Sequence, residues 1–221
     1  MRSWVAESRL LTDFLRGDVM ATTNEYAAFS AYVYNDQRGG GVSENANNKL
    51  PVPPGWKELS DLGFAPGDTL NEWNPVSFTA GAYLNEATGE IVIAYKGTDF
   101  LLDDRIYNTI ADLVTDVGMA LARKLGPYHI QQMLAAQYFL AVVNWAAENG
   151  KDPQKISFTG HSLGGGLASN MAVWFNRPAT TFAEAPFEAA VNNPATITLT
   201  AATLPAHAAI VQSMAVLEEI K

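Results

Sequence analysis

The alternation of apolar and polar positions divides the chain into helical, extended and irregular segments. Apolar residues recur at helical spacing in residues 4–15 and 25–34, which predicts two short helices at the start of the fold. Residues 35–56 are rich in Gly, Asn and Pro and show no periodicity, so this segment is predicted to be a loop.

The pattern changes at Ser77, where a sheet is predicted to begin. The segments SFTAGAYL and IVIAY flank the polar turn NEATGE, an arrangement that is typical of a β-hairpin. The second segment, residues 91–95, is apolar at every position, as expected of a central strand whose two faces are both covered.

Helical and extended patterns then alternate along the rest of the chain. The pattern predicts three more helices, at residues 105–125, 128–149 and 206–220. It also predicts one more strand, at residues 179–186. Residues 156–175 combine both patterns, because an apolar strand passes through a turn into a helix. Strands that alternate with helices of this length predict a single α/β domain over residues 1–221, with helices on both faces of the sheet.

Composition limits the partners and the compartment. The 221 residues have a formal net charge of −9, so the chain lacks the basic surface that attracts nucleic acid. The absence of cysteine excludes disulfides and thiolate metal sites. The N-terminal segment MRSWVAESRLLTDFLRGD lacks the features of a signal peptide, which leaves a cytoplasmic protein or one secreted without a classical signal. Nothing in the sequence indicates the oligomeric state.

One short motif carries candidate chemistry. Residues 160–164, GHSLG, have the form G-x-S-x-G, with an apolar strand before them and the helical segment GGLASNMAVWF after them. This is the context of a nucleophile elbow, in which glycines let strand and helix approach closely around a strained serine. Ser162 is therefore the candidate nucleophile, and the backbone N–H of Leu163 is a candidate oxyanion donor. The simpler interpretation is a glycine-rich turn with an ordinary hydroxyl group.

Two further segments give the chain a family resemblance. AYKGTD at residues 94–99 and NTIADL at residues 108–113, together with the serine motif, resemble the class 3 lipases, in which a strand ends in a Tyr-Arg-Gly-Thr/Ser oxyanion turn. Over roughly residues 20–190 the chain is also similar to lipase-like domains of large bacterial proteins, some of them related to phospholipases A1. The resemblance implies an α/β-hydrolase-type, mostly parallel sheet and an enzyme that cleaves carboxylic esters of lipids.

The resemblance also implies roles for individual residues. Ser162 would be the nucleophile, and the N–H groups of Leu163 and Thr98 would form the oxyanion hole. Thr98 follows a strand end, where a sheet can leave a backbone N–H unpaired. Lys96 stands where these lipases more often have arginine. Lysine lacks the planar guanidinium group with which arginine forms paired hydrogen bonds. No cofactor is implied, and the expected partner is a phospholipid or acylglycerol substrate, with peripheral contact at a lipid interface as an option.

The sequence does not identify the acid and the base of a catalytic triad, and three alternatives remain. These hydrolases place serine, acid and histidine in that chain order, and the only histidine after Ser162 is His207. Glu184 and His207 would complete an internal triad. The short remainder of the chain favours instead a domain truncated at its C-terminus, with its last strands, acid and histidine beyond Lys221. A third alternative is a non-catalytic scaffold or interaction module of a larger bacterial secreted or effector protein.

The sequence predicts no metal site. Acidic residues gather after the AYKGTD turn, but their spacing matches no calcium loop, and carboxylates near a helix N-terminus suit the helix dipole. These residues are Asp99, Asp103, Asp104, Asp112 and Asp116.

Two histidines and one apolar segment have ordinary alternatives. His161 adjoins the serine, but adjacent side chains in a sharp turn diverge, so a role as the base is not expected. His129 is expected to cap a helix or to lie on the surface. Residues 100–110, FLLDDRIYNTI, are predicted either to form a lid over an acyl pocket or to bury one helical face in the core.

Overall fold

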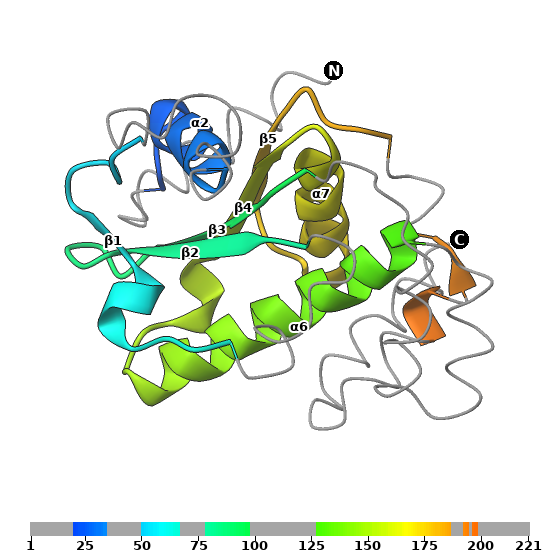
Figure 1. Ribbon diagram of the computed structural model, residues 1–221. Helices are drawn as coiled ribbons and strands as arrows, with labels where there is room; N and C mark the ends of the chain where they lie inside the picture. Colours follow the sequence, from blue (N-terminus) through cyan, green and yellow to red (C-terminus); the bar gives the residue numbers. More distant parts are fainter. Residues whose placement is uncertain are drawn as a thin grey trace, which may run out of the picture.

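A five-stranded sheet forms the centre of the fold in the computed structural model of the chain (Figure 1). The structure describes residues 20–34, 50–66, 78–97, 127–186, 192–194 and 196–198. The strands lie side by side in chain order: β1 (Trp56–Glu58), β2 (Ala80–Asn85), β3 (Ile91–Tyr95), β4 (Ile156–His161) and β5 (Ala179–Phe182). The β1–β2 and β2–β3 pairs are antiparallel, whereas β3–β4 and β4–β5 are parallel. The predicted α/β fold is confirmed, with a mixed sheet whose parallel half is made by β3, β4 and β5.

Helices cover both faces of the sheet, as predicted. Helix α2 (Thr23–Tyr32) lies on one face, and α6 (Pro127–Glu148) and α7 (Leu163–Phe175) pack on the other (Figure 1). Two short 3-10 helices, η3 (Leu59–Leu62) and η4 (Pro153–Lys155), precede strands or connect them. Within the described segments, no helix is long and apolar enough to cross a bilayer.

The start of the sheet differs from the prediction. Strand β1 lies at the end of the predicted loop 35–56, so the prediction that the sheet begins at Ser77 is wrong. A strand of three residues has no room for an alternating pattern, and it is held by pairing with β2 and by the packing of Trp56 against Phe29, with ring centroids 4.9 Å apart. The helices predicted at residues 4–15, 105–125 and 206–220 lie outside the described residues.

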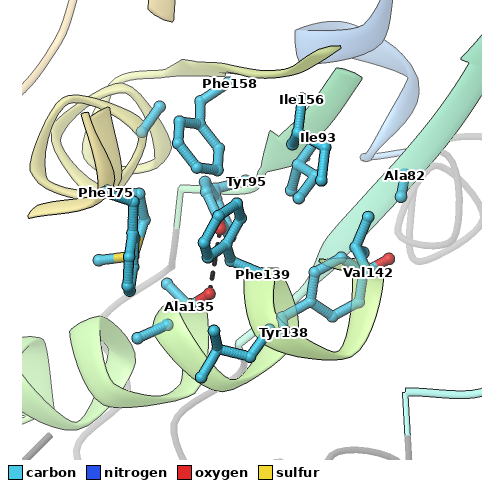
Figure 2. Close-up of a cluster of buried hydrophobic side chains, with 14 of the residues drawn as sticks. Ala82, Ile93, Tyr95, Ala135, Tyr138, Phe139, Val142, Ile156, Phe158 and Phe175 are labelled. Carbon is cyan, nitrogen blue, oxygen red and sulfur yellow. Dashed lines mark hydrogen bonds between the residues drawn. The ribbon is translucent and has the colours of Figure 1, made fainter. Parts of the chain in front are cut away.

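Strand β3 is buried on both faces, as its unbroken apolar sequence predicted. Ile91, Ile93 and Tyr95 point toward α6 and α7, and Val92 and Ala94 point toward α2. Figure 2 shows Tyr95 surrounded by Phe139, Phe158 and other apolar side chains. The buried Tyr95 hydroxyl donates a hydrogen bond to the Ala135 carbonyl oxygen, 3.0 Å away, and so ties the end of β3 to α6.

A buried carboxylate lies on the opposite face, under α2. Glu90, just before β3, is 5 % exposed, and its Oε1 accepts hydrogen bonds from the Ala21 N–H at 2.9 Å and the Tyr26 hydroxyl at 3.5 Å. Burial raises the pKa of Glu90 above its usual value. Burial also raises the pKa of Tyr26 to about 12, so this tyrosine stays a hydrogen-bond donor at neutral pH.

The raised pKa of Glu90 predicts a pH-dependent stability. A group whose pKa is higher in the folded state binds its proton more tightly there, so its contribution is present at low pH and is lost as pH rises through the folded-state pKa. We expect the free energy of unfolding of the wild type, relative to Glu90→Gln, to fall as pH rises from about 4 toward neutrality. Urea denaturation at several pH values measures this difference. Glu86→Gln is the control, since Glu86 forms a surface ion pair with Lys57, and a pH-independent difference for Glu90→Gln would contradict the expectation.

Candidate active site

Ser162 occupies a sharp turn between β4 and α7. The strand ends at His161 and the helix begins at Leu163, so the predicted succession of strand, serine and helix is present. Ser162 has φ 57° and ψ −124°, a conformation that non-glycine residues rarely adopt. Its side chain is exposed and makes no capping hydrogen bond to α7. The turn therefore presents the hydroxyl group to solvent at a cost in backbone strain.

Glycines are required around this turn because backbone atoms approach too closely for a side chain. A Cβ atom at Gly160 would overlap the carbonyl oxygen of Gly164, and one at Gly164 would overlap the carbonyl oxygen of Tyr95. A Cβ at Gly165 would lie 2.9 Å from the Cβ of Glu184. Gly160 and Gly164 thus let α7 fold back against the ends of β3 and β4.

The backbone of Ser162 is fixed from the neighbouring strand. The Ser162 N–H donates to the Phe182 carbonyl oxygen at 3.1 Å, and the Ala185 N–H donates to the Ser162 carbonyl oxygen at 2.9 Å. The hydroxyl group, by contrast, forms no hydrogen bond with any residue that the structure describes. The main chain of Ser162 is therefore fixed, while its hydroxyl group is exposed.

The end of β3 reaches the same turn. A Cβ placed on Gly97 would lie 3.2 Å from the His161 carbonyl oxygen and 3.4 Å from the Leu163 nitrogen. The Leu163 N–H, a predicted oxyanion donor, has no acceptor among the described residues. Thr98, the other predicted donor, lies outside the described residues, but it directly follows Gly97 in the chain.

A tyrosine that the sequence did not single out contacts this strand end. The Gly97 N–H donates to the Tyr34 hydroxyl oxygen at 2.9 Å, across 63 residues of sequence. Lys96, which is 3 % exposed, places its Nζ 5.7 Å from the centroid of the Tyr34 ring. The one sequence signal for Tyr34 is that it lies within the span, roughly residues 20–190, over which the chain resembles lipase-like domains.

Glu184, the internal candidate for the triad acid, lies just beyond β5. Its Oε2 accepts hydrogen bonds from the hydroxyl groups of Ser169 at 2.5 Å and Thr181 at 2.8 Å. The side chain is exposed, and its Oε1 accepts no hydrogen bond within the described part of the chain. His207, the candidate base, lies outside the described residues, so the pair Glu184 and His207 stays a prediction.

Neither of the two described histidines forms a hydrogen bond with the serine hydroxyl. His161 is exposed. His129, in the first turn of α6, is half-buried rather than on the surface, and its Nδ1 lies 3.0 Å from Gln132 Oε1 and 2.6 Å from Thr196 Oγ1. Burial lowers the pKa of His129, which favours the neutral ring. His129 thus joins α6 to a segment far along the chain, a contact that no local sequence pattern indicates.

Metal ligands do not gather in the described segments, where no group of three suitable side chains comes together. The five aspartates from Asp99, the last residue of AYKGTD, to Asp116 lie outside those segments, as does the predicted lid at residues 100–110.

Comparison with known proteins adds the family. The model of the Tle-like phospholipase domain, a phospholipase-like family, matches residues 25–216, which include both the end of β3 and the serine turn. No curated protein gives a match. Because the matched span covers most of the chain, the protein belongs to the family of Tle-like phospholipase domains, a membership that indicates hydrolysis of lipid esters or a related effector role.

Proposed function

We propose that this chain is a serine hydrolase of the class 3 lipase type, similar to phospholipases A1, that cleaves carboxylic esters of phospholipids or acylglycerols. The observation that carries the proposal is the backbone of Ser162, which holds an exposed hydroxyl at a positive φ between a parallel strand and a helix. That hydroxyl forms no hydrogen bond with the residues that the structure describes. Strain of this kind needs compensation from its surroundings, and it is common where a side chain performs chemistry.

In the first half of the reaction, Ser162 attacks the ester carbonyl carbon. A base accepts the hydroxyl proton, and the carbonyl oxygen becomes an oxyanion. The N–H groups of Leu163 and Thr98 stabilise that charge. Support comes from the position of Gly97, whose neighbour along the chain is Thr98 and which packs against the Leu163 nitrogen.

In the second half, the ester bond breaks and the acyl group stays on Ser162. The lysolipid or diacylglycerol leaves as an alcohol and takes the proton from the base. Water then attacks the acyl-enzyme with help from the same base, which releases the fatty acid and restores the serine hydroxyl. The chemistry requires a lipid substrate and no cofactor.

The base is a histidine in this proposal, and two sources for it stay open. One source is His207 with Glu184. The Oε1 of Glu184, which accepts no hydrogen bond from the described residues, is a suitable acceptor for a histidine N–H. A histidine and an acid in a continuation of the chain past Lys221 form the other. The two sources differ in whether the 221-residue chain reacts by itself.

Labelling with a fluorophosphonate tests the function. The reagent bonds covalently to an activated serine oxygen and releases fluoride, so we expect label on the wild type and none on Ser162→Ala. Ser60→Ala is the matched control, because Ser60 is also exposed but lies in η3 and should leave labelling unchanged. Absence of label on both the 221-residue chain and the full natural protein, with circular dichroism showing an intact fold, would favour a non-catalytic scaffold.

Two further variants identify the base and the acid. Label that disappears from the 221-residue chain with His207→Ala and weakens with Glu184→Gln supports the internal triad. Label that survives both changes excludes it. Mass spectrometry of the products from phosphatidylglycerol vesicles and from triolein emulsions then separates a phospholipase from an acylglycerol lipase.

A further inference from the structure

We infer that Tyr34 positions the oxyanion turn, by accepting the backbone hydrogen bond that fixes Gly97 beside the nucleophile. The inference rests on the proposed function, because it assigns a task to a residue of the same site. Tyr34 follows α2 closely, and its hydroxyl oxygen lies 2.9 Å from the Gly97 nitrogen at the far end of β3.

The Gly97 N–H needs this partner because the regular pairing of β3 ends just before it. The last hydrogen bond to the neighbouring strand segment runs from the Lys96 N–H to the Thr79 carbonyl oxygen, at 3.0 Å. The next N–H along the chain has left the sheet, and Gly97 is half-buried, so an unpaired donor there would be costly. The Tyr34 hydroxyl takes the place of a strand partner.

Fixing this peptide also fixes the start of the next one, which carries the Thr98 N–H. Gly97 is wedged between the Tyr34 hydroxyl and the backbone of the serine turn, since a Cβ added to it would lie 2.8 Å from that hydroxyl oxygen and 3.4 Å from the Leu163 nitrogen. One proposed oxyanion donor is therefore attached to Gly97, and the other lies against it. A hydroxyl that anchors Gly97 therefore fixes the residue to which both proposed donors are tied, one through the chain and one through packing.

The ring of Tyr34 is held in place independently of its hydroxyl. The buried Lys96 ammonium lies 5.7 Å from the ring centroid, a cation–π distance. The Tyr34 N–H donates to the Ala31 carbonyl oxygen at 3.3 Å, which keeps the residue against the end of α2. Phenylalanine would keep the ring and both of these contacts, and it would remove the hydroxyl oxygen that accepts from Gly97.

Tyr34→Phe in the full natural protein tests this role. We expect kcat for a soluble ester such as 4-nitrophenyl butyrate to fall about 10- to 100-fold, less than for the loss of an oxyanion donor itself, with KM nearly unchanged. A trifluoromethyl ketone inhibitor, which forms a serine hemiketal with a negative oxygen in the hole, should weaken by the same factor as kcat/KM. A change that only destabilised the fold would not reduce kcat/KM and the affinity for the inhibitor by the same factor.

Tyr32→Phe is the matched control. Tyr32 is the last residue of α2, two positions before Tyr34, and its hydroxyl donates to Oε2 of Glu58 in β1 at 3.3 Å, away from the serine turn. We expect Tyr32→Phe to keep the kinetics and the inhibitor affinity of the wild type. Hydrogen exchange of the Gly97 amide should accelerate in Tyr34→Phe and stay slow in Tyr32→Phe.

The outcomes separate this inference from the function on which it rests. Hydrolysis that depends on Ser162 but keeps its kcat in Tyr34→Phe overturns the role of Tyr34 alone. An equal loss of kcat in Tyr32→Phe overturns it as well, because the effect would then belong to the helix in general. Hydrolysis that survives Ser162→Ala overturns both proposals.

Discussion

Replacing Ser162 with glycine is expected to abolish ester hydrolysis and at the same time to stabilise the fold. If Ser162 is the nucleophile, as proposed, its loss lowers kcat by on the order of a millionfold, the effect that removal of the nucleophile has in serine hydrolases. The gain arises because φ 57° with ψ −124° strains any residue with a Cβ, and glycine adopts it freely. We expect the free energy of unfolding to rise by about 1–3 kcal/mol.

Ser162→Ala is the comparison that separates these two effects. It removes the same hydroxyl and keeps the Cβ, so it should lose activity equally and gain little stability. Urea denaturation gives the free energies, and hydrolysis of phospholipid vesicles gives the rates. Equal stability of the glycine and alanine variants would show that the turn is not strained, and the main support for the nucleophile would be lost.

Replacing Gly164 with alanine is expected to destabilise the fold strongly. The added methyl group would overlap the carbonyl oxygen of Tyr95, whose backbone is fixed in the sheet and whose side chain is fixed by its hydrogen bond to Ala135. Neither α7 nor β3 can move without disturbing the core between them. Overpacking against rigid surroundings costs about 1–3 kcal/mol and sometimes more, and we expect the upper end of this range.

Gly165→Ala is the graded control for this prediction. Its methyl group would lie 2.9 Å from the Cβ of Glu184, an exposed residue beyond the end of β5 that has more freedom to shift. Thermal unfolding should therefore show a smaller loss of stability for Gly165→Ala than for Gly164→Ala. Fluorophosphonate labelling should fall in the same order, because opening of the turn moves the serine. An unchanged melting temperature for Gly164→Ala would contradict the close packing of α7 on β3.

The parts of the fold that the sequence predicted are those in which burial acts on many consecutive residues. β3 is apolar at all five positions because both of its faces are covered, and no loop would be selected for that pattern. The serine turn was predictable for a different reason, since two glycines and a serine at fixed spacing answer to contacts within one short segment. Where contacts within one segment determine its residues, the sequence of that segment is sufficient to predict its structure.

The contacts that the sequence did not predict join residues that are far apart. β1 has three residues and is stabilised by pairing with β2 and by packing against Phe29. The sequence of the strand itself indicates neither contact. The bond from Gly97 to Tyr34 crosses 63 positions, and any other tyrosine would have looked the same in the sequence. The base of the proposed triad has no local sequence signal, because its position in space relative to the serine defines it and its spacing along the chain does not.

The main-chain bonds that hold Ser162 to the end of β5 and to the residues just after it have a consequence for sequence variation in this protein. Both bonds use backbone atoms only, the carbonyl oxygen of Phe182 and the N–H of Ala185. Substitution of these two side chains would therefore leave the serine in place. The amino acids at positions 182 and 185 can differ between related chains without loss of the turn. Proline at position 185 is the exception, since it has no N–H to donate. A segment with little sequence identity among relatives would still hold Ser162 in the same position.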